Sequence, residues 1–232
     1  MSDIDGTLTG DAAALDELKL ILESHRDRVS FGVASGRSPA LVEEAVLEFG
    51  LPAPELIIAA AGSEIAEPDW LGAAWAGQMA PGWDRAATER LLAGVDGLVA
   101  QDSAGQGAFK VSWLAGVAAA ERARLALDGA GVRANLVHSH GRFLDVMPRG
   151  VDKGSAVRFA AERLGAGLER TIVAGDSGND EAMLLCGARP VLVANFDREV
   201  AHLAARPDVY TAPRPHAGGV IDGLRYHGAI AG

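Results

Sequence analysis

The chain has 232 residues, enough for one large domain or for a medium-sized domain that carries a smaller insertion. Hydrophobic residues make up 49% of the sequence and charged residues 22%, which is typical of a folded globular protein and excludes a disordered chain. The formal net charge of −10, without any cluster of Lys or Arg, argues against nucleic acid as a partner.

Cysteine content and hydropathy exclude further classes. The single cysteine, Cys186, cannot form an internal disulfide and has no zinc-ligand spacing around it, so we expect a buried thiol in a reducing compartment. No apolar stretch reaches the roughly 18 residues of a membrane span, and the N-terminus lacks a basic region followed by an apolar one. We therefore expect a cytoplasmic protein with no membrane partner.

The N-terminal part of the chain alternates helical and strand patterns. Residues 11–25 carry apolar side chains at helical spacing, and residues 29–34 have the composition of a buried strand. Ser38 and Pro39 favour a helix start, which predicts a helix over 40–49, and residues 56–60 form the next predicted strand. Such alternation is typical of a doubly wound parallel sheet in an α/β protein.

The character of the sequence changes at residues 69–82, which are rich in Trp, Gly and Pro. The elements predicted after this stretch are a helix over 83–92, a strand over 108–114, a helix over 118–127, and a hairpin of strands 132–137 and 143–147. Pro148 and Gly150 mark the end of this region. We therefore predict an inserted α+β domain over residues 66–148, and a main domain formed by residues 1–65 and 149–232.

The α/β alternation resumes after the insertion. The predicted elements are a helix over 153–164, a strand over 171–174, a helix over 180–185 and a strand over 190–194. Ligands of open α/β sheets bind where the strands end. The polar residues that follow the predicted strands are therefore the candidate functional residues.

The first polar segment is Asp3-Ile4-Asp5-Gly6-Thr7. Residues two apart in an extended chain project to the same side, and Gly6 permits a sharp turn after them. The carboxylates of Asp3 and Asp5 therefore converge, and such a pair suits a hard cation such as Mg²⁺ or a nucleophile with a separate acid. Taken alone, however, an Asp-Gly-Thr sequence is more often a simple turn.

Three further segments strengthen this interpretation. Asp176 and Asp180, at the end of a later strand, supply further carboxylate oxygen for a cation. Ser35-Gly36-Arg37 follows the strand over 29–34 and offers a hydroxyl and backbone N–H groups to a phosphate. Lys153 begins a helix and can neutralise phosphate charge, although a single lysine is more often a solvated surface charge.

In this order, the four segments resemble the motifs of the haloacid dehalogenase superfamily, at Asp3 to Leu8, Ser35, Lys153 and Gly175 to Asp180. An insertion between the second and third motifs is similar to a C2-type cap. Shorter stretches, such as Ala34-Ser35-Gly36-Arg37-Ser38, Phe109-Lys110-Val111-Ser112 and Leu144-Asp145-Val146-Met147-Pro148, are similar to the sucrose-phosphate phosphatase group.

The resemblance implies a Rossmann-like core and a phosphomonoester hydrolase that acts on a sugar phosphate, with sucrose 6-phosphate as the first candidate. Asp3 would be the nucleophile that forms an aspartyl-phosphate, and Asp5 the general acid and base. Ser35 and Lys153 would stabilise the charge of the transferring phosphoryl group.

The resemblance also implies the ligands of the metal and of the substrate. Mg²⁺ would be held by Asp3, by Asp176 and by the backbone carbonyl of Asp5. Asp180 would complete the metal site from a position just outside these direct ligands. The residues implied to bind the sugar phosphate are Ser35, Gly36, Arg37, Lys153 and Asn179, together with Lys110 from the cap, where a solvated or structural role is the simpler alternative.

Several alternatives stay open. Another phosphatase of the superfamily, for trehalose-, glucosylglycerol- or mannosylglycerate-phosphate, would use the same core residues, and so would a phosphomutase. Only Met1 and Ser2 precede Asp3 where the family has a central strand, so we expect Asp3 to be disordered or displaced, with weak metal binding and poor activity. A phosphosugar-binding module without strong catalysis is therefore a further hypothesis. We expect a monomer or a weak dimer.

Overall fold

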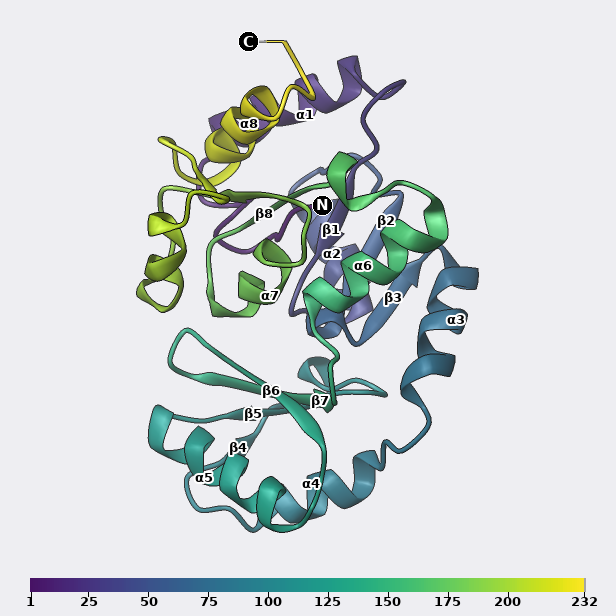
Figure 1. Cartoon of the computed structure of the whole chain (residues 1–232), viewed down its shortest axis with the longest axis vertical. Helices are drawn as coiled ribbons and strands as arrows, with labels where there is room; N and C mark the ends of the chain where they lie inside the picture. The colour runs from purple at the N-terminus through teal and green to yellow at the C-terminus, as the bar shows by residue number, and fades with distance from the viewer. Residues whose placement is uncertain (232) are drawn as a thin grey trace.

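The computed structural model describes residues 1–231 of the chain. Figure 1 shows two bodies: a mixed sheet with helices on both faces, and an antiparallel sheet with helices on one face. The α/β class with a parallel sheet, predicted from the sequence, is confirmed. No helix within residues 1–231 is both long enough and apolar enough to cross a bilayer.

The main sheet is built from two halves. One half has the order β3 (Glu64–Glu67), β2 (Leu56–Ala59), β1 (Gly32–Ala34), and the other has the order β8 (Ile172–Gly175), β9 (Arg189–Leu192), β10 (Tyr210–Thr211). Every pair of neighbours within these halves is parallel except β2 with β3. The carboxyl ends of β1, β2, β8, β9 and β10 therefore lie at one edge of the sheet, whereas β3 runs in the opposite direction.

The first three residues join the two halves. Ser2 forms parallel bridges to β1 and to β8. Ala34 N donates to Ser2 O (2.9 Å), Asp3 N donates to Ala174 O (2.9 Å), and Ala174 N donates to Met1 O (3.0 Å). The expectation that Asp3 is displaced is therefore wrong, because a ladder of only three residues is enough to place its side chain at the end of the sheet.

Helices cover this sheet on both sides (Figure 1). They are α1 (Ala12–Ser24), α2 (Pro39–Glu48), α3 (Asp69–Met79), α6 (Lys153–Leu164), α7 (Glu181–Leu184) and α8 (His216–Tyr226). Helix α1 confirms the predicted helix over 11–25. The Asp11 side chain accepts a hydrogen bond from Ala14 N and so caps the start of α1. Short 3₁₀ segments are η1 (Ala60–Gly62), η3 (Leu168–Arg170), η4 (Gly178–Asp180) and η5 (Arg198–Ala205).

Helix α3 lies in a stretch for which the sequence predicted no helix. Leu71, Trp75 and Met79 are buried on one side of α3 and belong to the same hydrophobic cluster as Phe159 of α6. The rings of Trp75 and Phe159 lie 4.9 Å apart, and Trp75 Nε1 donates to Gly62 O (2.9 Å). The start of the inserted region is thus packed against the main body. Cys186 is a buried free thiol, as predicted.

The antiparallel sheet has the order β4 (Val99–Ala100), β5 (Val111–Leu114), β7 (Phe143–Pro148), β6 (Ala134–Ser139). The predicted hairpin is confirmed, because β6 and β7 pair through residues 134–139 and 143–148. Helices α4 (Arg85–Ala93) and α5 (Val117–Gly129) cover one face, where Leu92, Trp113 and Leu127 are buried, and the 3₁₀ segment η2 (Ser103–Gly105) lies between β4 and β5. Figure 1 shows the other face turned toward the main body.

Candidate active site

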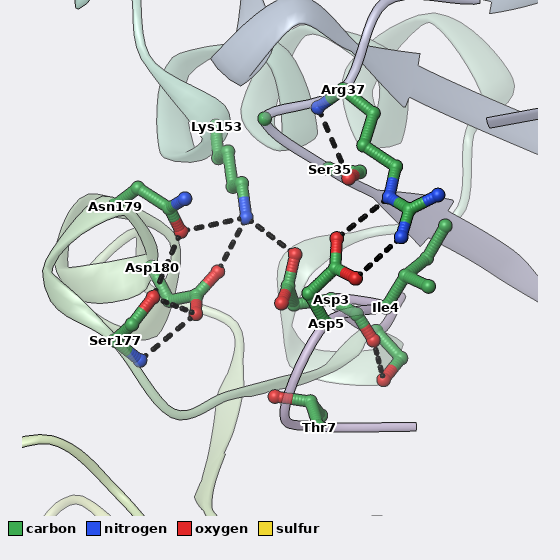
Figure 2. Close-up of polar contacts among 12 residues, drawn as sticks. Asp3, Ile4, Asp5, Thr7, Ser35, Arg37, Lys153, Ser177, Asn179 and Asp180 are labelled. Atoms are coloured by element: carbon green, nitrogen blue, oxygen red, sulfur yellow. Dashed lines mark hydrogen bonds and ion pairs between the residues drawn. The ribbon is translucent and has the colours of Figure 1, made fainter. Parts of the chain in front are cut away.

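The polar residues that the sequence placed at strand ends come together at one edge of the main sheet. Figure 2 shows the ammonium group of Lys153 between Asp3 on one side and Asn179 and Asp180 on the other. Asp3 follows the short ladder of residues 1–3, and Asn179 and Asp180 follow β8. Segments far apart in the sequence therefore build one site.

Lys153 is fully buried, so the alternative of a solvated surface lysine is wrong. Its Nζ donates to Asp3 Oδ1 (2.7 Å), to Asp180 Oδ1 (2.7 Å) and to Asn179 Oδ1 (2.9 Å). Burial alone would lower the pKa of this amine, but the adjacent carboxylates of Asp180 and Asp3 outweigh burial and raise the pKa. The lysine is therefore a fixed positive charge at the centre of the site.

The position of Lys153 depends on the way α6 begins. Asp152 caps the helix, since its side chain accepts from Ser155 N (2.7 Å) and Ser155 Oγ accepts from Asp152 N (2.9 Å). Gly62 of η1 has φ 98°, and a Cβ there would lie 2.2 Å from the carbonyl carbon of Asp152 and 2.5 Å from Lys153 N. Two backbone segments thus touch directly where the lysine enters the site.

Three carboxylates gather around this lysine. One carboxylate oxygen from each of Asp3, Asp176 and Asp180 lies within 4.8 Å of the others, and all three residues are buried. Burial, followed by the charge of Asp180, raises the pKa of Asp3 well above its usual range. Burial also raises the pKa of Asp176 to about 6, although a hydrogen bond from Thr7 opposes the shift.

The charges of Lys153 and the three carboxylates do not cancel within the site. One ammonium stands against three carboxylates, so the site has an excess of negative charge that a divalent cation with oxygen ligands would offset. Among the described residues, Asp3 and Asp176 each keep one carboxylate oxygen that accepts no hydrogen bond. The donor set therefore fits Mg²⁺.

Asp180 is engaged differently from the other two carboxylates. Its Oδ1 accepts from Lys153 (2.7 Å), and its Oδ2 accepts from the backbone N–H groups of Asp176 and Ser177, both at 3.1 Å. Because both oxygens are already used, Asp180 is better suited to orient Lys153 and the loop of Asp176 than to bind a cation directly. This geometry fits a place just outside the metal's own ligands.

The side chain of Asp5 turns away from the acidic cluster (Figure 2). Its two oxygens accept from Nε and a terminal nitrogen of Arg37, at 2.8 and 2.7 Å. The Asp5 side chain is 51% exposed, in contrast to the buried Asp3. Asp5 is thus the most exposed of the four predicted carboxylates.

Ser35 and Gly36 lie at the end of β1 beside Arg37. The buried hydroxyl of Ser35 accepts from Arg37 N (3.2 Å). A Cβ on Gly36 would lie 3.4 Å from the side-chain nitrogen of Asn179, so the segment after β1 and the segment after β8 are neighbours. The structure therefore brings together the two segments that were predicted to bind phosphate.

Lys110 reaches this edge from the antiparallel sheet. It is 3% exposed, its Nζ donates to Gly36 O (3.0 Å), and it lies 3.3 Å from a carboxylate oxygen of Asp145 on β7. Ser112 Oγ donates to the same Asp145 oxygen (2.5 Å). Lys110 is therefore held by its own sheet while it touches the segment Ser35-Gly36-Arg37 of the main body.

The sequence did not single out the residues that hold the loop after Asp5. Asn195 Nδ2 donates to Gly6 O (2.8 Å), His216 Nδ1 also lies 2.7 Å from this oxygen, and His216 N donates to Asn195 Oδ1 (2.8 Å). Asn195 follows the apolar strand β9, as the predicted site residues follow theirs, so its position at a strand end was the available sign.

Comparisons with known proteins agree on one group. The profile of a family described as sucrose-6F-phosphate phosphohydrolase matches residues 1–228. The mannosylfructose-phosphate phosphatase of Agrobacterium fabrum is 32% identical, over 98% of this chain and 95% of its own length. Sucrose-phosphatase 2 of Nicotiana tabacum is 28% identical over 97% of this chain, which spans only 57% of the tobacco protein.

Solved structures show the same likeness. The sucrose-phosphatase of Synechocystis sp. PCC6803 superimposes with a TM-score of 0.92 at 28% identity, covering 98% of this chain and 96% of that one. A sugar phosphatase of haloacid dehalogenase subclass IIB superimposes with a TM-score of 0.67 at 17% identity, over 99% of this chain and 98% of that one, and shares the fold.

Proposed function

Because the chain belongs to the sucrose-6F-phosphate phosphohydrolase family of haloacid dehalogenase-type phosphatases, we propose that its substrate is a fructose-containing disaccharide phosphate. Sucrose 6F-phosphate is the first candidate, since the Synechocystis relative was solved with sucrose and phosphate. The observation that carries the chemistry is the buried contact of Lys153 with Asp3 and Asp180 beside Asp176.

In the proposed mechanism, Asp3 is the nucleophile. Lys153 holds Asp3 Oδ1 at 2.7 Å, and the second oxygen of Asp3 has no hydrogen-bond partner among the described residues. One oxygen of this carboxylate forms a bond to phosphorus and the other serves the cation, while the bond from phosphorus to the sugar oxygen breaks, which leaves an aspartyl-phosphate. A water molecule then attacks phosphorus, breaks its bond to Asp3 and releases inorganic phosphate.

Asp5 handles the protons of both steps in this proposal. In its protonated form it gives a proton to the departing sugar oxygen, and as a carboxylate it then takes a proton from the attacking water. Its bidentate pair with Arg37 occupies both oxygens, so an oxygen becomes available only when Arg37 shifts toward another anion. The phosphate of an arriving substrate is such an anion.

The remaining residues keep charge and phosphate in place. Mg²⁺, when bound through Asp3 and Asp176, supplies positive charge that offsets the repulsion between the attacking carboxylate and the phosphate. Lys153 neutralises part of the charge on the transferring oxygens. Ser35 and the neighbouring backbone N–H groups bind the phosphate oxygens, and Asn179 orients them.

We assign substrate selection to the inserted region. The division into a core of residues 1–65 and 149–232 and a cap of residues 66–148 is part of this proposal, with α3 packed on the core and the antiparallel sheet facing the site. Lys110 is the proposed sugar contact, because its ammonium group lies beside Gly36 where the sugar portion would meet the phosphate-binding segment.

A second candidate substrate is mannosylfructose-phosphate. The Agrobacterium relative named for this substrate is 32% identical across nearly the whole chain, above the 28% of the sucrose-phosphatases. Both names describe a fructose-containing disaccharide that carries phosphate, so the core residues treat them alike. The difference lies in the second sugar, which only the cap can distinguish.

A panel of phosphate-release assays tests this proposal. The substrates are sucrose 6F-phosphate, mannosylfructose-phosphate, trehalose 6-phosphate and fructose 6-phosphate, each with Mg²⁺ and with EDTA. We expect the highest kcat/KM for one of the two fructose-containing disaccharides and loss of turnover in EDTA. Preference for trehalose 6-phosphate or for the monosaccharide would show that the substrate class is wrong, and transfer of phosphate between sugars without release would identify a phosphomutase.

A further inference from the structure

The turn between β6 and β7 touches the main body at Asp197 and Glu199, whereas Lys110 touches it at Gly36. The carboxylate of Glu199 accepts hydrogen bonds from His140 N (3.1 Å) and Gly141 N (2.8 Å). The ring nitrogen Nδ1 of His140 lies 2.8 Å from Asp197 Oδ2. Two carboxylates of one short segment thus meet the tip of one hairpin.

The shape of the turn fits this contact. His140 has φ 52° and Gly141 has φ 60°, so two successive residues adopt the left-handed region. For His140, which carries a side chain, this backbone conformation is uncommon. Successive backbone N–H groups in a turn form a small anion-binding concavity, and the carboxylate of Glu199 fills it.

The segment that follows β8 leaves room for the contact between Glu199 and the hairpin. Gly178 lies beneath the hairpin, and a Cβ there would be 2.5 Å from Glu199 Oε2 and 3.3 Å from His138 O. Gly178 precedes Asn179 and Asp180, which contact Lys153. The tip of the hairpin therefore rests directly against the part of the core that carries the site.

The segment that supplies Glu199 also touches both acidic loops. Asp197 N donates to Asp176 O (2.8 Å), and Asn195 Nδ2 donates to Gly6 O (2.8 Å). Within five residues, the chain therefore contacts the hairpin of the cap, the loop of Asp176 and the loop that follows Asp5. We define residues 195–199 as the coupling segment.

We propose that the coupling segment positions the cap over the acidic cluster, with Glu199 as the positioning residue for the hairpin. The side chains of His140 and Asp197 are each 42% exposed, and surface contacts of this kind are weak enough to break and re-form. The contact therefore closes the cap over a bound sugar phosphate without locking it. This inference rests on the proposed role of the cap in sugar binding.

Two variants and two measurements test the proposal. Glu199→Gln leaves only one acceptor oxygen for two N–H groups, while Glu181→Gln is the matched control, because Glu181 pairs with the exposed His202 at 3.0 Å without reaching the cap. The first measurement is hydrogen exchange of the amides of His140 and Gly141. We expect exchange to be about tenfold faster in Glu199→Gln than in the wild-type protein, and unchanged in Glu181→Gln.

The second measurement compares two substrates. For sucrose 6F-phosphate we expect Glu199→Gln to raise KM about fivefold, with a smaller change in kcat. For p-nitrophenyl phosphate, whose small leaving group has little to contact in the cap, we expect a clearly smaller loss of kcat/KM. Equal losses on both substrates, or amide exchange that matches the wild type, would overturn the proposal.

The two measurements separate this inference from the proposed function. If the wild-type protein releases no phosphate from sucrose 6F-phosphate, the substrate assignment is wrong for that sugar. Hydrogen exchange then decides alone: faster exchange in Glu199→Gln but not in Glu181→Gln supports the contact, and equal exchange in both variants contradicts it.

Discussion

The acidic cluster and the cap hairpin face the same site but are held in opposite ways. Lys153 and Asp180 are both 0% exposed and interlocked by short hydrogen bonds, whereas the His140 and Asp197 side chains at the cap contact are 42% exposed. Buried charges hold the residues that we propose for the phosphate chemistry, and weaker surface contacts position the part that we propose selects the sugar. Substitutions in the two regions should therefore have different effects.

The largest expected effect is that of Asp3→Asn, which removes the attacking carboxylate oxygen while preserving the size of the side chain. Phosphate release should fall by at least about 1,000-fold on every substrate, because an amide is a poor nucleophile. Steady-state release of inorganic phosphate measures the loss. Asp11→Asn is the control, since Asn still caps α1, and full activity of Asp3→Asn would show that Asp3 is not the nucleophile.

Lys153→Met tests how strongly the buried charges hold the core. Removing the ammonium leaves Asp3 and Asp180 without their cation, so the free energy of unfolding should fall by about 3–5 kcal/mol in EDTA. Urea unfolding measures this change. The control is Lys19→Met, which breaks the surface pair with Asp16 and should cost less than about 1 kcal/mol; equal losses would contradict a stabilising role for Lys153.

The cation and pH should act on the same cluster with a predictable sign. Because burial raises the pKa of Asp176 to about 6, the folded protein without metal binds this proton more readily than the unfolded chain does. This contribution to stability is present at low pH and is lost as pH rises through about 6, where the bare carboxylate becomes available to a cation.

Mg²⁺ should therefore stabilise the fold mainly above pH 6. At saturating Mg²⁺ we expect the thermal midpoint to rise by about 5 °C at pH 7.5 relative to EDTA, and to change little at pH 5. Thermal melts at the two pH values check this expectation. Greater stabilisation by Mg²⁺ at pH 5 than at pH 7.5 would contradict binding through ionised Asp176 and Asp3.

A smaller effect is expected on the cap side, in Lys110→Met. This change should raise KM for the preferred disaccharide phosphate about tenfold, and affect p-nitrophenyl phosphate less, because the phosphate-handling residues stay in place. Kinetics on both substrates measure the difference, and urea unfolding reports whether Asp145, left with Ser112 but without its lysine, loosens the cap. Equal losses on both substrates would assign Lys110 to the core chemistry instead.

The sequence predicted that the proposed phosphate-handling residues would gather at one edge of the sheet, and it did so for a physical reason. Parallel strands bring their carboxyl ends to one edge, so Ser35 and Asp176 were expected to lie close together once the strands before them were identified, whereas no strand was predicted before Asp3. The burial of Lys153 could not be read from its own neighbours in the sequence. It depends on the close approach of η1 and α6, which are far apart in the chain.

The failures have physical reasons too. Helix α3 contains Gly72 and Gly77, which lower its intrinsic helix propensity, and packing of Trp75 against Phe159 outweighs that penalty. The expectation of a displaced Asp3 assumed that a full strand was needed. The ladder formed by residues 1–3 shows that few hydrogen bonds to both neighbours are enough.

The coupling segment was missed because its partners lie far away in the sequence. Glu199 contacts residues 58 and 59 positions earlier, and Asn195 contacts a carbonyl 189 positions earlier. No spacing pattern within residues 195–199 predicts such contacts. A carboxylate at the protein surface is usually solvated, and only the three-dimensional arrangement distinguishes that of Glu199.

The backbone contact at Gly62 limits which sequences can maintain this site. Any side chain there would collide with the peptide between Asp152 and Lys153, and the positive φ of Gly62 adds strain for every other residue. A saturation library at position 62 selected for phosphatase activity should return glycine almost alone. This position should thus be as intolerant of substitution as one that carries a reacting side chain. Intolerance to substitution at this position would reflect the absence of a side chain rather than any chemistry performed by one.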